Sequence, residues 1–336
     1  MTKDSIVLSS RVRLARNYED LPFDLAQRPE DAARCVSRAA GALRASRLGA
    51  AFELHRLQDM SDVNRLALAE SRLISRDLLR VPETAAVLIR AEDALSVMIN
   101  EDDHLRIQAI RPAMDLTGAA QACFEVDDVL SRQAAFAFDE QLGYLTACPT
   151  NTGTGMRASL LMHLPMLTHG KQMGNVGQLV AKVGLNIRGV YGEGSEALGS
   201  VYQISNQATL GRTEQELISA VTAVGVQLSD MENALREKAL KEGRMPLEDL
   251  VFRAWGIMQN ARIMKLTEFY QHWSYLRLGA AMALLPLPVH VADALLDQAQ
   301  DAHLAVWAEE SLSGQALDEC RASRIRDLIA GAQMML

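Results

Sequence analysis

Paired arginines occur near the start of the sequence, in the segment Ser9–Arg16 (SSRVRLAR). Alternate side chains of an extended segment lie on one face, so Arg11 and Arg13 would point the same way. A guanidinium is a planar fork of donors, and two of them at this spacing can grip neighbouring phosphate oxygens. A solvated surface pair remains the alternative when the segment is taken alone.

Acidic residues and an arginine meet in the segment Ile99–Gln108 (INEDDHLRIQ). On a strand, residues of one parity share a face, which predicts two sets: Asp102, His104 and Arg106 on one side, and Glu101 and Asp103 on the other. A carboxylate beside an arginine on an inward face is costly unless it is paired or functional. The segment is therefore a candidate functional site, and an ordinary acidic turn between strands is the alternative.

Two glycine-rich segments carry further arginines: CPTNTGTGMRAS at Cys148–Ser159 and RGVYGEGSEA at residues 188–197. Gly153 and Gly155 would let backbone amides approach an anion. Arg157 is predicted to open a short apolar helix, whose N-terminus favours negative charge. The usual nucleotide-loop signatures, GxxxxGK[ST] and a strand–GxGxxG–helix unit, are absent from the sequence.

Composition excludes several classes of protein. The 336 residues carry a net charge of −8, which argues against a nucleic-acid protein. The 34 basic residues comprise 28 Arg and 6 Lys. No apolar stretch approaches the length of a membrane span. Four widely spaced cysteines favour free thiols and a cytoplasmic protein: Cys35, Cys123, Cys148 and Cys320.

Hydrophobic periodicity predicts an α+β region followed by a helical one. Helices are expected at 28–48 and 113–133, at a short segment that Pro165 ends, and from the Thr213/Glu216 capping box to about Lys241. Strands are expected at 86–90, 95–100, 105–110, 144–147, 185–191 and 201–205, the first three as an antiparallel meander. Residues 245–336 have helical periodicity almost throughout, which predicts a domain boundary near 240.

Taken together, four blocks resemble the phosphagen (ATP:guanidino) kinases: Ser9–Arg13, Asn100–Arg106, Cys148–Ser159 and Arg188–Glu193. They occur in the order that the family has, and the likeness continues through Ile204–Gly211. The resemblance covers about residues 5–240. It implies a mostly antiparallel sheet flanked by helices, similar to that of glutamine synthetase, followed by a smaller all-helical domain over residues 241–336.

Within this family the sequence resembles the bacterial protein-arginine kinases. Their C-terminal domain has counterparts of Tyr275–Gly279 (YLRLG) and Asp318–Arg326 (DECRASRIR). Kinases of free guanidines carry a helical domain ahead of the first block, whereas eight residues precede Ser9 here. The resemblance implies transfer of the ATP γ-phosphoryl group to arginine residues of proteins. A kinase for free arginine or another small guanidine, and a catalytically weak regulator that binds phosphoarginine or ATP, are the alternatives.

The resemblance also implies roles for particular residues. Glu193 and Asp102 would be the catalytic carboxylates, and Cys148 would lie near the substrate. The ATP-binding residues would be Ser9, Ser10, Arg11, Val12, Arg13, Arg106, Arg157, Ala158, Ser159, Leu160, Leu161, Arg188, Gly189, Val190, Tyr191 and Gly192. Asp318 and Arg321 would bind phosphoarginine. No protein ligand is expected for Mg²⁺, which the nucleotide phosphates and water would hold.

Three positions depart from the family pattern. Asp102 stands where the family has a second glutamate, which bears on the rate. Arg72, in the stretch Ser71–Ser75, replaces a histidine that lies near the adenine. Leu317 replaces the first arginine of the phosphoarginine-binding pattern, which bears on product sensing.

The expected partners follow from the same resemblance. They are protein substrates with exposed arginines, a second copy of the chain in a homodimer, an activator protein and protein-quality-control partners. Neither nucleic acid nor a membrane is expected as a partner.

Overall fold

An antiparallel sheet of eight strands organises the first part of the chain, in the order β2-β3-β4-β5-β1-β8-β10-β9. The structure is a computed structural model that describes residues 6–23, 28–190 and 197–334. The strands are β1 (Val7–Arg16), β2 (Glu53–Arg56), β3 (Ala86–Arg90), β4 (Leu95–Ile99), β5 (Leu105–Pro112), β8 (Met156–His163), β9 (Leu185–Gly189) and β10 (Val201–Asn206). A separate small hairpin pairs β6 (Phe138–Asp139) with β7 (Gly143–Tyr144).

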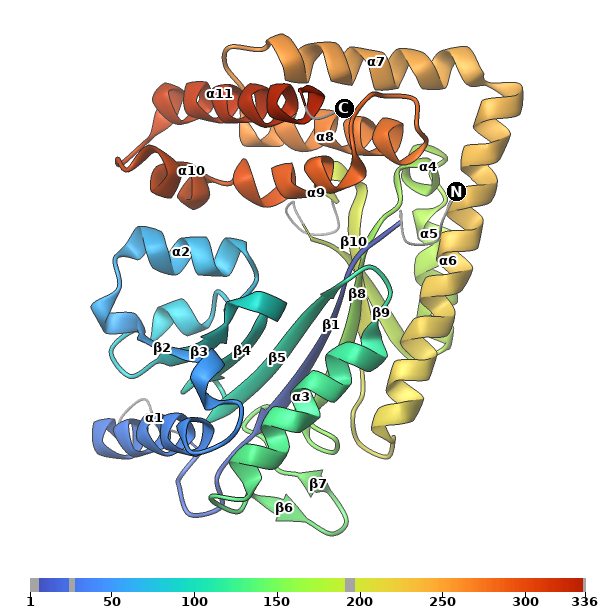
Figure 1. The fold of residues 1–336 in the computed structure, drawn as a ribbon. Coiled ribbons are helices and arrows are strands. Elements are labelled where there is room, and N and C mark those ends of the chain that lie inside the picture. Colours follow the sequence, from blue (N-terminus) through green and yellow to red (C-terminus); the bar gives the residue numbers. More distant parts are fainter. Residues whose placement is uncertain (1–5, 24–27, 191–196, 335–336) are drawn as a thin grey trace.

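One face of this sheet is apolar and covered by helices. Val12 and Leu14 of β1 are buried there, together with alternate residues of the neighbouring strands. The covering helices are α1 (Pro29–Arg44), α3 (Leu116–Ser131), α5 (Met173–Lys182) and α6 (Glu214–Glu242). Figure 1 shows α3 and α6 running along the sheet. The predicted α+β fold class is confirmed, as is the capping box that opens α6.

The opposite face of the sheet is polar. In the register of the central strands, Arg13 of β1 lies opposite Gln108 of β5 and opposite Arg157 of β8. Residues directly opposite one another point to the same face. The alternation predicted for Arg11 and Arg13 therefore places both on this polar face, among side chains from the neighbouring strands.

The segment after the Gly/Thr loop is a strand, and the predicted helix that Arg157 would open is wrong. Met156–His163 forms β8 between β1 and β10, and Pro165 begins the short helix α4 (Pro165–His169) rather than ending one. A short apolar run that is buried on both sides suits a central strand and a helix equally by composition. Pairing with strands remote in sequence decides between them.

The helical region packs against one end of the sheet (Figure 1). Its helices are α7 (Arg244–Asn260), α8 (Leu266–Ala281), α9 (Val289–Gln298), α10 (Asp301–Ala308) and α11 (Gly314–Gln333). They enclose a second core around Trp273, which also takes in Leu161 of β8 and Val201 of β10. Helix α10 lies against α2 (Asp62–Glu70), so the helical region also contacts the β2 edge of the molecule.

Short 3-10 helices complete the described elements. They lie at Gly49–Ala51, Leu57–Asp59, Leu78–Arg80, Ala91–Asp93, Pro149–Asn151 and Leu198–Ser200.

Candidate active site

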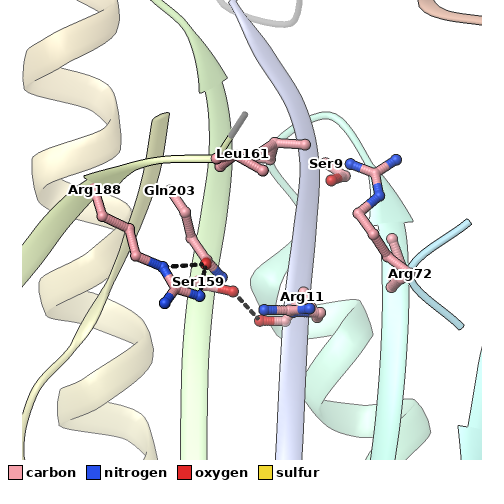
Figure 2. A pocket seen from close by; sticks show the side chains of 9 residues that line it. Ser9, Arg11, Arg72, Ser159, Leu161, Arg188 and Gln203 are labelled. Carbon is pink, nitrogen blue, oxygen red and sulfur yellow. Dashed lines mark hydrogen bonds between the residues drawn. The ribbon is translucent and has the colours of Figure 1, made fainter. Parts of the chain in front are cut away.

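Arginines from four strands converge on the polar face of the sheet: Arg11 and Arg13 of β1, Arg106 of β5, Arg157 of β8 and Arg188 of β9. A cavity of about 150 Å³ opens beside them. Figure 2 shows Arg188 on one side of this cavity and Arg11 near its centre. The sheet thus brings together the five arginines that the sequence assigned to the ATP phosphates.

Three of these arginines, Arg11, Arg13 and Arg157, lie among other cations that disfavour their charged forms. Burial, reinforced by the neighbouring guanidinium groups, lowers the pKa of Arg11 to about 9. The same causes lower the pKa of Arg13 well below its ordinary value, and that of Arg157 as well. A shift in this direction means that the surroundings disfavour the charged forms. A bound polyanion would reverse that cost, so the arrangement suits a nucleotide's phosphates.

Two of these arginines are oriented by neutral side chains. Arg157 donates to Ser205 Oγ at 3.0 Å, and both Nε and Nη2 of Arg188 donate to Gln203 Oε1, at 3.2 and 2.9 Å. A neutral acceptor fixes the direction of a guanidinium without cancelling its charge. The positive charge of both groups thus remains directed at the cavity side of the sheet.

The remaining predicted ATP-binding residues lie on both faces of the sheet, because neighbouring residues of a strand point to opposite faces. Ser9, Ser159, Leu161 and Val190 line the cavity, and Gly189 ends β9. Four others belong to the helix-covered face and are buried: Ser10, Val12, Ala158 and Leu160. A contact between these four and a nucleotide would have to come from the backbone.

The acidic segment is a turn, so the strand alternation predicted for it is wrong. Strand β4 ends at Ile99 and β5 begins at Leu105, with Asn100 at a φ of +63°. Glu101 is buried in an ion pair with Arg106 and accepts a hydrogen bond from Ser75. The intervening turn frees consecutive residues from the two-residue alternation of a strand, which is why Glu101 also reaches Arg106.

Asp102 is the open carboxylate of this turn. Its side chain is 59% exposed, against 2% for that of Glu101, and its Oδ2 lies 3.5 Å from Arg106 Nη2. Burial raises the pKa of Glu101, while the nearby Arg106 opposes that shift. Two carboxylates therefore lie beside Arg106: Glu101 is buried in an ion pair with it, and Asp102 is accessible to solvent.

Asp103 and His104 of the acidic segment have structural roles that the sequence analysis did not predict. Asp103 is buried and accepts from Asn17 Nδ2 and from the backbone N–H of Ala147, each at 2.7 Å. His104 Nδ1 accepts from the N–H of Tyr18 at 2.9 Å, and burial lowers the pKa of this ring. Asp103 thereby ties the acidic turn to the residue that precedes Cys148.

The glycines of the Gly/Thr loop pack against protein backbone, which corrects the expectation that they open the loop to an anion. A Cβ on Gly153 would lie 2.6 Å from the carbonyl oxygen of Thr209, and one on Gly155 would lie 2.6 Å from that of Ala15. Both glycines also have positive φ, at 121° and 63°. Cys148 is partly exposed, with its Sγ 3.0 Å from Thr150 Oγ1.

Three predicted site residues lie outside the described residues: Tyr191, Gly192 and the proposed second carboxylate Glu193.

In the helical region, Arg321 forms the centre of a buried network. Its side chain is 1% exposed and its three nitrogens donate to Ala299 O, Met264 O, Asp318 and Asp301. A phosphate would have to displace one of these acceptors. Phosphoarginine binding by Asp318 and Arg321 stays a prediction.

Replacing Arg321 by alanine should destabilise the protein by about 3–5 kcal/mol, because two backbone acceptors and the carboxylates of Asp318 and Asp301 lose their partner. Thermal unfolding measures this loss. The control Arg253→Ala removes an exposed helical pair with Asp249 and should change stability by less than about 0.5 kcal/mol. Equal melting of the two variants would contradict the buried network. A phosphoarginine peptide that binds the parent but not a folded Arg321→Lys variant would establish the predicted site.

Comparisons with known proteins agree with this geometry. Residues 35–235 match the ATP:guanido phosphotransferase C-terminal catalytic domain, and residues 244–335 match the protein-arginine kinase McsB C-terminal domain. Among solved structures, the duplicated taurocyamine kinase of Schistosoma mansoni with bound transition-state-analogue components superposes with a TM-score of 0.62 at 27% identity, over 73% of this chain and 36% of that one. Lombricine kinase has the same fold, with a TM-score of 0.61 at 23% identity over 70% and 68%.

The chain belongs to the ATP:guanido phosphotransferase family. Two relatives that are similar over most of their length are protein-arginine kinases. That of Moorella thermoacetica is 43% identical over 330 residues, which are 97% of this chain and 94% of the relative. That of Symbiobacterium thermophilum is 42% identical over 325 residues, which are 96% and 92%.

Across the described part of the chain, no helix combines the length and the apolar character needed to cross a bilayer. Within the same residues, no group of three or more histidine, cysteine, aspartate or glutamate side chains is arranged to hold a metal ion.

Proposed function

We propose that this chain transfers the γ-phosphoryl group of MgATP to the guanidino nitrogen of arginine residues in proteins. The observation that carries the proposal is the cluster of five arginines from four strands on one polar sheet face, beside an accessible carboxylate at Asp102. The match of residues 244–335 to the C-terminal domain of protein-arginine kinases supports a protein as acceptor.

Phosphoryl transfer depends mainly on positioning and on electrostatic stabilisation. The arginine cluster would neutralise the nucleotide phosphates and the charge that spreads over the transferring group's equatorial oxygens. Because the sheet and the neutral partners of Arg157 and Arg188 hold these groups before ATP arrives, little reorganisation is needed during the reaction.

The acceptor, an arginine guanidinium, must be oriented and deprotonated before it can attack the γ-phosphorus. A guanidinium has a pKa above about 12 and is a poor nucleophile until it is oriented and loses a proton. Asp102 is exposed beside Arg106, so it can grip a substrate guanidinium and accept that proton. Glu101 is committed to Arg106 and Ser75, which assigns it to holding the phosphate-binding arginine in place. Glu193 would supply the second carboxylate.

Mg²⁺ fits this site as a companion of the nucleotide. Two carboxylates stand at Arg106, and the described face of the sheet is otherwise dominated by arginine. Mg²⁺ keeps several waters and is commonly bound through substrate phosphates, where it would neutralise their charge. The chain's own residues would bind the phosphates, orient the acceptor and take its proton.

Two other functions make different predictions. The solved relatives are named for taurocyamine and lombricine, which leaves a small guanidine as an alternative acceptor. A regulator that binds ATP or phosphoarginine without transfer is the alternative of another class. The named relatives, similar over nearly their whole length, favour the protein kinase.

Incubation with MgATP and an unfolded arginine-rich protein should produce acid-labile phosphate on arginine, detected by mass spectrometry at neutral pH. Free arginine in a parallel reaction should give much slower ADP release, because it lacks the surrounding polypeptide. The matched control is the same protein with its arginines changed to lysine. Efficient transfer to free arginine alone would favour the small-guanidine kinase, and ATP binding with no turnover would favour the regulator.

We also propose that two copies associate through α7 and that the chain divides into domains near residue 240. Met245, Phe252 and Ile257 are exposed apolar residues on α7, with exposures of 74%, 49% and 36%. Helix α6 ends at Glu242 and α7 begins at Arg244, between the two cores.

The activator and protein-quality-control partners are proposed from the family resemblance alone.

A further inference from the structure

Arg72 enters the cavity from outside the strands that carry the other arginines. It lies two residues after the end of helix α2, and its side chain lines the cavity together with Arg11 and Arg188. Figure 2 shows Arg72 and Arg188 on opposite sides, with Arg11 between them. A sixth guanidinium therefore faces the same space as two arginines of the phosphate-binding cluster.

The backbone at Arg72 is fixed in the orientation that this requires. Arg72 has a φ of +63°, in the left-handed region that usually favours glycine. Its N–H donates to Ala69 O at 3.0 Å, and its carbonyl oxygen accepts from Gln108 Nε2 at 2.7 Å. Gln108 lies on β5 opposite Arg13, so the turn that ends α2 is attached to the polar face of the sheet.

The C-terminal helices hold the same segment from the other side. Asp297 of α9 lies 3.6 Å from the Arg72 guanidinium. Glu70 accepts from the backbone N–H groups of Ala302 and His303 in the first turn of α10, at 3.0 and 3.1 Å. His303 also contacts Glu70 through Nδ1 at 2.8 Å and Ser71 through Nε2 at 3.0 Å. Three consecutive residues, 70–72, thus join the helical region to the cavity.

We propose that Arg72 binds the nucleotide's α- or β-phosphate in this chain, and that the C-terminal helical region holds it in place through Asp297 and through the contact of α10 with Glu70 and Ser71. This inference rests on the proposed function, since it takes ATP as the ligand. It goes beyond it by assigning a phosphate contact to Arg72, at a position that the family resemblance puts near the adenine, and a positioning role to Asp297.

The position of Arg72 among the arginines indicates that it contacts the α- or β-phosphate of the nucleotide rather than the γ-phosphate. The cavity that Arg72 lines is also lined by Arg11 and Arg188, and neither Arg13 nor Arg106 lines it. Arg72 therefore lies at the Arg11 end, away from the acidic turn where the acceptor and the γ-phosphate would meet. A residue at that end should bind ADP and ATP equally.

The test is direct binding of ADP and of MgATP by calorimetry, without any arginine substrate. Arg72→Ala should weaken both by about tenfold or more, as expected for the loss of a charge-assisted contact to phosphate. Arg72→Lys should recover part of the loss, because it keeps the charge but not the fork. The control Arg76→Ala removes an exposed arginine of the same segment that lines the grooves beside α10, and should leave both affinities unchanged.

Asp297→Asn tests the positioning role in a double-mutant cycle. It should weaken ADP binding by about threefold or more in the parent and have little effect in the Arg72→Ala background, since coupled residues are not additive. Parent-like ADP affinity in a folded Arg72→Ala variant, or an equal loss in Arg76→Ala, would overturn the proposal. If Arg72→Ala does not fold, Arg72→Gln replaces it in the same cycle. A parent that binds neither nucleotide would instead refute the proposed function.

Discussion

Replacing Asp102 by asparagine should lower the rate of phosphoryl transfer by about 100- to 10,000-fold, the range expected when a positioned proton acceptor is lost. ATP affinity should stay nearly unchanged, because Asp102 is exposed and Arg106 keeps its buried partner Glu101. The measurement is kcat and the KM for ATP with a saturating protein substrate. A large fall in kcat at constant KM is the expected pattern.

Two variants control this result. Asp102→Glu should preserve or raise the rate, because it restores the longer side chain that the family carries and advances the carboxylate by about 1.5 Å. Glu101→Gln should mainly raise the KM for ATP and lower stability, since Glu101 pairs with Arg106 inside the protein. Full activity of Asp102→Asn together with an inactive Glu101→Gln would transfer the catalytic role to Glu101.

Strand parity made part of the site predictable from sequence. Arg11 and Arg13 share a face because β1 is a regular extended strand, so a period of two places them correctly. The same rule failed at Glu101 and Asp102, where the chain leaves β4 and turns into β5. A turn of this kind depends on the left-handed backbone at Asn100, which composition alone does not reveal.

Long-range pairing explains the error at Arg157. Its segment is apolar and short, so local pattern does not distinguish a central strand from a helix. Strands β1 and β10 flank it, and each is remote in sequence from β8. The five arginines could therefore be listed from sequence, whereas their common face depends on a sheet order that puts β5, β1 and β8 side by side.

Contacts between the two regions were the least predictable part of the molecule. The sequence shows Arg72 as a departure from the family at a position near the adenine, but nothing local to it indicates its contact with Asp297, which is remote in the sequence. Asp103 lies in a run of acidic residues, and nothing in that run indicates that it is a buried acceptor for the N–H of Ala147. Such roles follow from tertiary proximity, because a buried carboxylate is stable only where donors from other segments meet it.

Replacing Arg157 by alanine should lower the rate of transfer by at least about 100-fold, since one preorganised donor at developing charge contributes about 3 kcal/mol. Arg157 projects from a central strand directly opposite Arg13, and a neutral serine orients it. Arg157→Lys should be intermediate, because it keeps the charge and loses the planar fork. Steady-state kinetics with MgATP and an unfolded protein substrate measures both variants.

The same substitution should leave thermal stability unchanged or raise it. The charge of Arg157 lowers the pKa of Arg13 and of Arg11, which means that these cations repel one another in the absence of nucleotide. Removing one of these cations relieves that repulsion. The control is Arg111→Ala. Arg111 lies on the opposite face of β5 and pairs with Asp93, so its loss should lower stability and leave the transfer rate unchanged. A loss of activity without a loss of stability would identify Arg157 as a functional cation. A parallel fall in both would mean that Arg157 supports the sheet instead.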